Sequence, residues 1–186
     1  FKNVFFKYPD ASEYVLHDMS FKAERGQTVA FIGSTGSGKS TAINLVPRFY
    51  DATEGEVLVD GVNVKDYTLA ALRDKIGYVP QRAVMFSGTV ESNVTYGEKA
   101  GLEYSEEGVK EAVRIAQGQE FVEEKEDGYK AHVAQGGTNF SGGQKQRLAI
   151  ARAVYRRPEI YIFDDSFSAL DYKTDKQLRT ALREET

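Results

Sequence analysis

A glycine-rich stretch of eight residues carries the clearest chemistry in this sequence. It consists of Gly33, Ser34, Thr35, Gly36, Ser37, Gly38, Lys39 and Ser40. Glycines allow backbone N–H groups to turn inward around an anion. Lys39 adds a cation that reaches the outer phosphates of a nucleoside triphosphate, and the Ser40 hydroxyl is a ligand for Mg²⁺. We therefore predict a phosphate-binding loop here, in preference to a flexible Gly/Ser turn that contains a lysine.

The flanking segments match what such a loop requires. Thr28–Ile32 is a continuous apolar run, which predicts a buried parallel strand that ends at Gly33. The segment Ser40–Phe49 reads as a helix. A strand before the loop and a helix after it place the helix N-terminus, with its favourable dipole, at the phosphates.

A second chemical feature is an acidic strand end. The apolar run Ile160–Phe163 predicts the last buried strand, and Asp164 and Asp165 follow it. Asp164 is expected to hold Mg²⁺, partly through water. Asp165 stands where a general base for an attacking water belongs, and such a base must come within about 2.6–3.2 Å of the oxygen that carries the proton or act through one water. The alternative is a pair of solvated carboxylates.

A third feature, the segment Phe140–Arg147, is a second glycine-rich turn that opens a helix, Gln144–Tyr155. Ser141 and the backbone of Gly142 and Gly143 can present hydrogen-bond donors to an anion such as a phosphate at that helix N-terminus. The alternative is an ordinary helix N-cap with a glycine-rich entry.

The remaining pattern predicts an α/β fold. We expect a P-loop NTPase core with a mostly parallel sheet, an N-terminal antiparallel β region and an inserted helical subdomain. The predicted core is 1–88 plus 142–186, and the predicted subdomain is 89–141. The other expected elements are strands at Val4–Phe6, Val15–Leu16, Glu56–Gly61 and Ile76–Val79, and helices at Ala70–Asp74, Glu107–Gln117 and Thr174–Glu184.

Bulk composition excludes several classes. The 186 residues carry a net charge of −4 and no cysteine, which argues against a nucleic-acid binder working through bulk charge, a disulfide framework and a thiolate metal site. No apolar run approaches the roughly 20 residues of a spanning helix, and no signal peptide opens the chain.

These motifs together resemble the ATPase domains of the ATP-binding-cassette (ABC) family over nearly the whole chain. Gly33–Thr41 resembles the Walker A loop and Ile160–Asp164 the Walker B strand. Phe140–Gln144 resembles the signature motif, with Phe140 where Leu is usual. Gln81 matches the glutamine of the Q-loop, and Ser168–Asp171 matches the D-loop. Tyr8 matches an aromatic residue that stacks on adenine. The resemblance implies ATP and Mg²⁺ as cofactors.

It also implies roles for single residues. Tyr8 would offer its ring to adenine, or else pack in the core. Gln81 would bind Mg²⁺ or the attacking water, or else be a turn residue. Asp171 would contact a partner domain, or else cap a helix. Lys39, Gln81 and Asp165 would be the catalytic residues.

The resemblance further implies partners and a location. In the family, two domains sandwich two ATPs head to tail, so that each ATP lies under the other chain's Ser141–Gln144 equivalent. The segment Phe86–Gly97 resembles exporter-type cassettes, which dock on the membrane domain of a transporter at the cytoplasmic face of the cell membrane. No nucleic-acid partner is expected.

Three departures from the family pattern stand out. Asp165 replaces a catalytic glutamate, and Val133–Gly137 lacks the acidic residue usual before the signature motif. The chain ends at Thr186, before the family's switch histidine, and neither His17 nor His132 fits that position. We therefore expect a trimmed domain that lacks the C-terminal part. We also expect it to come from one half of a heterodimeric exporter of drugs or lipids, with a hydrolytically weak site of its own.

Two other classes remain open at this point. One is a soluble ABC ATPase of DNA repair or translation, although the long coiled-coil insertions or tandem cassettes usual there do not occur. The other is a regulatory domain that clamps ATP without hydrolysing it, which Asp165 would allow. Neither the transported substrate nor the choice between a homodimer and a heterodimer can be inferred from the sequence.

Overall fold

The computed structural model describes residues 1–97 and 99–186. The chain divides into two compact units, Phe1–Arg73 and Asp74–Thr186. Each unit has apolar side chains that are fully buried. They include Val4, Leu45 and Leu72 in the first unit, and Val79, Val113, Leu148, Ile150 and Leu178 in the second.

The N-terminal unit is built on antiparallel strands. β1 (Lys2–Phe6) lies between β2 (Leu16–Met19) and β3 (Glu54–Glu56), and both pairings are antiparallel. β4 (Leu58–Val59) and β5 (Val62–Asn63) form a separate hairpin. Val4 and Phe6 are buried, whereas Asn3 is exposed and Phe5 is partly exposed, so that one face of β1 is apolar and buried.

The predicted strand Thr28–Ile32 is wrong in this structure. No strand is assigned to residues 27–37, and the side chains of Val29 and Ile32 are 41% and 95% exposed. A parallel strand exists only through hydrogen bonds to its neighbours, and the described part of the N-terminal unit contains only antiparallel pairs. The segment Thr28–Ile32 therefore has the composition of a strand but, among the described residues, no neighbouring strand with which to pair.

The predicted helix after the phosphate loop is shorter than expected. α1 spans Lys39–Asn44, whereas the sequence suggested a helix to Phe49. Pro47 explains the early end, because proline has no N–H to donate and disfavours helical backbone in the residue before it. Turns follow, and Arg48 adopts a left-handed backbone with φ 56°.

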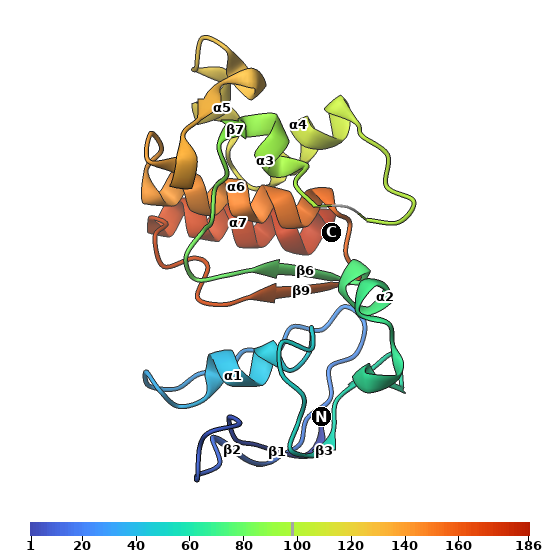
Figure 1. The fold of residues 1–186 in the computed structure, drawn as a ribbon. Helices are drawn as coiled ribbons and strands as arrows, with labels where there is room; N and C mark the ends of the chain where they lie inside the picture. Colours follow the sequence, from blue (N-terminus) through green and yellow to red (C-terminus); the bar gives the residue numbers. More distant parts are fainter. Residues whose placement is uncertain (98) are drawn as a thin grey trace. The chain divides into compact units, whose positions relative to one another are not determined.

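The C-terminal unit contains a parallel strand pair and several helices (Figure 1). β6 (Ile76–Val79) and β9 (Ile160–Phe163) run side by side in register, Ile76 opposite Ile160 and Val79 opposite Phe163. The long helix α6 (Gly142–Tyr155) begins within the signature segment, Phe140–Arg147. The second long helix, α7 (Tyr172–Glu185), follows the acidic end of β9. The shorter elements are α2 (Leu69–Asp74) at the unit boundary, α3 (Val90–Val94), α4 (Glu106–Ile115), α5 (Gln119–Glu123), β7 (Gly88–Thr89) and β8 (His132–Val133).

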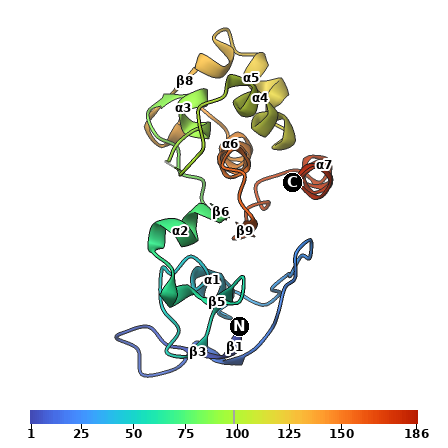
Figure 2. The same ribbon diagram turned by 90° about the vertical axis from the view of Figure 1, so that its right-hand side faces the viewer.

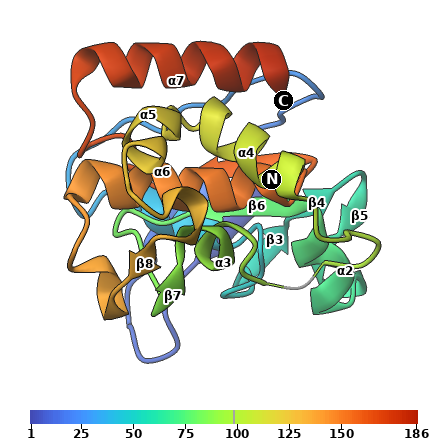
Figure 3. The ribbon, with the colours of Figure 1, turned by 90° about the horizontal axis from the view of Figure 1, so that it is seen from above.

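These helices surround α6. Figure 2 shows α6 end-on with α3, α4 and α5 around it, and in Figure 3 the same helix lies over β6. Val109, Ala112 and Val113 of α4 are buried, as their helical spacing predicts. Single turns of 3₁₀ helix occur at Val64–Asp66, Gly128–Lys130 and Gln135–Gly137. The predicted core and subdomain boundaries stay a prediction.

Candidate functional site

The glycine-rich loop in the N-terminal unit has the backbone of an anion cradle. Gly36 and Gly38 have φ values of 81° and 91°, in the left-handed region that favours glycine. Gly38 caps α1 without any side-chain hydrogen bond. A Cβ built on Gly33 would lie 2.5 Å from the Ser37 hydroxyl oxygen. Gly36 and Gly38 are therefore favoured by the backbone of the loop, and a side chain at Gly33 would require the Ser37 hydroxyl to move.

Lys39 bends back over this loop. Its Nζ donates to the carbonyl oxygens of Gly33 and, at 3.3 Å, of Ser34. A further hydrogen bond closes the loop from Ser37 N to the Ser34 carbonyl at 3.1 Å. The ammonium thus sits over the turn around which an anion would bind, and the residues present fit a phosphate group.

The predicted base-binding residue, Tyr8, lies close to this loop. Its hydroxyl oxygen is 2.8 Å from the hydroxyl oxygen of Thr41, within hydrogen-bond distance. The ring contacts Phe6 and Tyr50 edge-on, with centroids 5.0 and 5.2 Å away. Tyr8 therefore lies in an aromatic cluster and is half-buried, so that part of it remains accessible.

In the C-terminal unit, the parallel strand pair brings other predicted residues together. Chain segments that leave the carboxyl ends of β6 and β9 meet at one edge. Asp164 N and the buried Ser166 hydroxyl both donate to the Val79 carbonyl, at 3.0 and 2.6 Å. As a result, Gln81 Nε2 lies 3.3 Å from Asp165 Oδ2 and donates a hydrogen bond to it.

The two adjacent carboxylates have different surroundings. Burial, together with the neighbouring Asp164 carboxylate, raises the pKa of Tyr78 to about 12, so this phenol stays protonated. Asp165 has a left-handed backbone with φ 47°, and its carbonyl accepts a hydrogen bond from the Ser168 hydroxyl at 3.0 Å. A non-glycine residue in this conformation is uncommon and is often found at functional sites.

The signature segment forms a capping box at the start of α6. The Ser141 hydroxyl accepts from Gln144 N at 3.1 Å, and Ser141 N donates to Gln144 Oε1 at 3.0 Å. Ser141 and Gly142 are nevertheless exposed. Phe140 is buried beside Phe121, with Lys125 Nζ 4.4 Å from its ring centroid. A phenylalanine is therefore accommodated where the family usually has leucine.

The D-loop aspartate also caps a helix. Asp171 accepts from Thr174 N at 2.9 Å and from the Thr174 hydroxyl at 2.8 Å, and these bonds lower the pKa of its carboxyl group. A Cβ on Gly143 would lie 3.1 Å from the Ala169 carbonyl oxygen. The signature segment and the D-loop are therefore in close contact within this chain.

Sequence reasoning missed two polar residues of α6 that form hydrogen bonds with other segments, the buried Gln146 and the partly buried Arg152. Gln146 is on the buried side of α6, and its Nε2 lies 3.4 Å from the carbonyl oxygens of Pro80 and Gln81. Arg152 donates to the Asn93 carbonyl at 2.8 Å and to the Val84 carbonyl at 2.9 Å. A polar side chain among the apolar positions of a helix is the sequence signal that could have revealed them.

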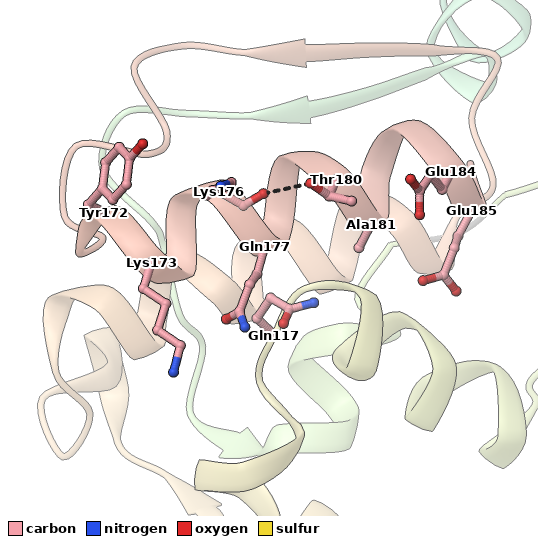
Figure 4. Close-up of a pocket in the computed structure, with 9 residues that line it drawn as sticks. All are labelled: Gln117, Tyr172, Lys173, Lys176, Gln177, Thr180, Ala181, Glu184 and Glu185. Atoms are coloured by element: carbon pink, nitrogen blue, oxygen red, sulfur yellow. Dashed lines mark hydrogen bonds between the residues drawn. The ribbon is translucent and has the colours of Figure 1, made fainter.

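Two hollows occur in the described part of the C-terminal unit. One, of about 570 Å³, lies against α7 and Gln117 (Figure 4). The other, of about 680 Å³, is lined by α4, the end of α6 and the C-terminus. Neither contains a residue predicted to bind nucleotide.

A divalent ion is implied by the family resemblance. The predicted ligands are the Ser40 hydroxyl, the Gln81 amide oxygen and the Asp164 carboxylate, which are all oxygens of the kind that Mg²⁺ prefers. Since the Gln81 amide directs its nitrogen at Asp165, its oxygen is the end left for a cation. Over residues 1–97 and 99–186, no cluster of three or more His, Cys, Asp or Glu side chains could hold a metal ion.

Comparison with known proteins identifies the family. The sequence pattern described as ABC transporter matches residues 16–168. The chain is 53% identical over 179 residues to an ABC transporter ATP-binding protein of Mycobacterium tuberculosis, with 96% of this chain and 30% of that protein covered. It is 43% identical over 182 residues to the ATP-dependent lipid A-core flippase of Pasteurella multocida, with 98% and 31% covered.

A solved structure agrees with these sequences. The structure of a bacterial Atm1-family ABC exporter with ATP bound matches with a TM-score of 0.92 and 38% identity, over 100% of this chain and 32% of that one. This chain belongs to the ABC transporter family. It spans about a third of the length of the relatives described here. In the described part of the chain, no helix has the length and apolar character needed to cross a membrane.

Proposed function

We propose that this chain is an ATP-binding and ATP-hydrolysing domain of an ABC exporter, on the cytoplasmic face of a membrane. The observation that carries this proposal is the phosphate loop, with Lys39 folded over a turn whose glycines adopt left-handed backbone. The backbone N–H groups and Lys39 would bind the phosphates, and Tyr8 would stack on the base. Mg²⁺ would neutralise phosphate charge, held by Ser40, Asp164 and Gln81.

The remaining predicted residues would act at two sites. Gln81 and Asp165, which share a hydrogen bond, would position the water that attacks this chain's own ATP. Ser141, Gly142, Gly143 and Gln144 would contact the ATP held by a second ABC domain. Asp171 would add a contact across the dimer. A transmembrane domain would be the third component, and its helices would decide the substrate.

The exporter assignment is supported by the relatives. The names of similar proteins include a lipid A-core flippase and, in Entamoeba histolytica, Multidrug resistance protein 1, which is 45% identical over 98% of this chain and 14% of that protein. Phe86 and Tyr96 of the exporter-like segment are partly exposed and stack with centroids 4.1 Å apart. This pair is a suitable contact for an apolar segment of the membrane domain.

The experiment is nucleotide binding and turnover in the full-length protein in membranes. We expect the wild type to bind MgATP and hydrolyse it. Lys39→Ala should weaken MgATP binding at this site by at least about tenfold, since it removes the loop's cation. Lys125→Ala is the matched control, because Lys125 lies over Phe140, outside the phosphate loop. Equal MgATP binding by Lys39→Ala and Lys125→Ala would contradict the proposal.

A second candidate is a regulatory clamp that binds ATP without hydrolysing it. Asp165 favours it, because an aspartate is one methylene shorter than glutamate and is held by Gln81 and Ser168. The two candidates differ in single-turnover hydrolysis by the chain paired with its natural partner. Hydrolysis of the ATP bound at this chain's own loop supports a slow enzyme, whereas release of unchanged ATP supports the clamp.

A further inference from the structure

The hydroxyl groups of Tyr8 and Thr41 connect two parts of the N-terminal unit that are 33 residues apart in sequence. Thr41 lies in the first turn of α1, two residues after Lys39, and it is buried. A buried hydroxyl requires a hydrogen-bond partner, and Tyr8 supplies it at 2.8 Å. The position of the Tyr8 ring is therefore tied to the helix that follows the phosphate loop.

Other contacts hold the same two parts together. The backbone at Tyr8 is fixed by a turn in which Ala11 N donates to the Tyr8 carbonyl at 2.9 Å. A Cβ on Gly38 would lie 3.1 Å from a methyl carbon of Leu16, at the start of β2. The β1–β2 hairpin and the phosphate loop thus pack closely, and the Tyr8–Thr41 bond is a polar link between them.

We propose that Thr41 is a positioning residue for Tyr8, which holds the base-stacking ring in register with the phosphate loop. This inference rests on the proposed function, since it assigns a purine nucleotide to the loop. The hydroxyl of Tyr8 then contributes to nucleotide affinity separately from its ring. A ring that is held in place before the ligand arrives loses less freedom on binding, so the hydrogen bond strengthens binding of the base but not of the phosphates.

The test compares two ligands on the full-length protein. A non-hydrolysable ATP analogue with Mg²⁺ engages both the ring and the loop, whereas magnesium tripolyphosphate engages the loop alone. We expect Tyr8→Phe to raise the Kd for the analogue about three- to tenfold, the effect of one lost hydrogen bond. Its Kd for tripolyphosphate should stay within about twofold of wild type.

A double-mutant cycle of Tyr8 and Thr41 tests whether Thr41 is the hydrogen-bond partner through which the Tyr8 hydroxyl acts. Thr41→Val should weaken analogue binding, and the double variant Tyr8→Phe/Thr41→Val should bind it no more weakly than the weaker single variant. Thr41→Ser should restore wild-type affinity because it keeps the hydroxyl. Tyr50→Phe is the matched control. This variant removes the Tyr50 hydroxyl from the same aromatic cluster, and among the described residues that hydroxyl forms no hydrogen bond.

Three results would overturn the inference. One is a Tyr8→Phe protein that binds the analogue as the wild type does. Another is a pair of single effects that multiply in the double variant. The third is an equal loss for tripolyphosphate and analogue in Tyr8→Phe. A wild-type protein that binds neither ligand overturns the proposed function as well, so the two failures are distinguishable.

Discussion

The carboxylate of Asp165 accepts a hydrogen bond from the Gln81 amide, with Nε2 and Oδ2 3.3 Å apart. The sequence predicted Asp165 from its place after an apolar strand and Gln81 from the family resemblance, and the structure places the two side by side. It could not predict the left-handed backbone of Asp165, with φ 47°, because that conformation depends on the turn in which Ser168 donates to the Asp165 carbonyl.

At this position we predict that Asp165→Glu raises single-turnover hydrolysis of the ATP bound on this chain's own phosphate loop, by about tenfold or more. The added methylene extends the carboxylate toward the attacking water, and a well-placed general base contributes ~10²–10⁴-fold. Rapid-quench measurement on this chain paired with its natural partner gives the rate. Asp165→Asn, which keeps the size but removes the charge, is the control. An Asp165→Glu rate equal to wild type would show that carboxylate length is not the defect.

Ser141 and Asp171 are residues for which the sequence left two roles open. Each was predicted with two alternatives, a helix cap or a contact to a partner, and in the structure each caps a helix. The cap does not exclude the other role, since Ser141 and Gly142 are exposed. Gln146 escaped prediction because its partners are backbone carbonyl groups on another segment, and a sequence does not reveal which segments will meet.

At the scale of elements, apolar periodicity predicted helices and strands with different success. The run Ile160–Phe163 became β9 because β6 pairs with it along its length. The similar run Thr28–Ile32 has no strand assignment. Pairing is a property of two segments, so composition alone could not separate these cases. The early end of α1 was readable from Pro47, but the expectation extended the helix beyond it.

The pairing of β3 with β1 depends on Gly55. Its φ is 81°, and a Cβ there would lie 2.2 Å from the Asn3 carbonyl oxygen. Gly61 has a similar φ of 75° but no heavy atom within 4 Å of its Cβ. We predict that Gly61→Ala costs about 1 kcal/mol of unfolding free energy, from backbone strain alone. Gly55→Ala should cost at least ~2 kcal/mol more, because β1 must also move.

Denaturant unfolding of the two variants measures this difference. Equal stabilities for Gly55→Ala and Gly61→Ala would mean that the strand contact is not tight in solution. Loss of the β1–β3 pairing should also lower amide protection along β1, which hydrogen exchange can report.

The parallel strand pair gives the fold a pH dependence. Burial raises the pKa of Tyr161 from its ordinary value near 10 to about 12, and a hydrogen bond with Thr186 opposes this shift. Below pH 10 the phenol is protonated in the folded and unfolded chains alike, and its contribution is fully present. Between pH 10 and 12 the unfolded chain loses the proton that the folded chain keeps, so the unfolding free energy falls as pH rises.

We therefore predict a shallower decline of stability between pH 10 and 12 in Tyr161→Phe than in wild type. Unfolding of both proteins at pH 8 gives the cost of the substitution itself, which is subtracted. Equal slopes for the two proteins over this pH window would contradict the raised pKa of Tyr161.

At the scale of the whole molecule, this chain covers about a third of relatives named as a flippase or an exporter. Its motifs differ in how completely they match the family pattern. The signature segment has a complete capping box on α6, whereas Asp165 replaces the glutamate that the family resemblance leads us to expect. We propose that this domain serves its partner's ATP better than its own, and that it pairs with a second domain that carries the catalytic glutamate.

Steady-state ATP turnover of the full-length protein assembled with its natural partner, with one substitution at a time in this chain, tests that claim most directly. Ser141→Arg, which blocks the N-terminus of α6, should remove most of the turnover, because the partner's site loses its signature contact. Asp165→Asn should leave most of it. The opposite pattern, with turnover lost in Asp165→Asn and retained in Ser141→Arg, would contradict the account.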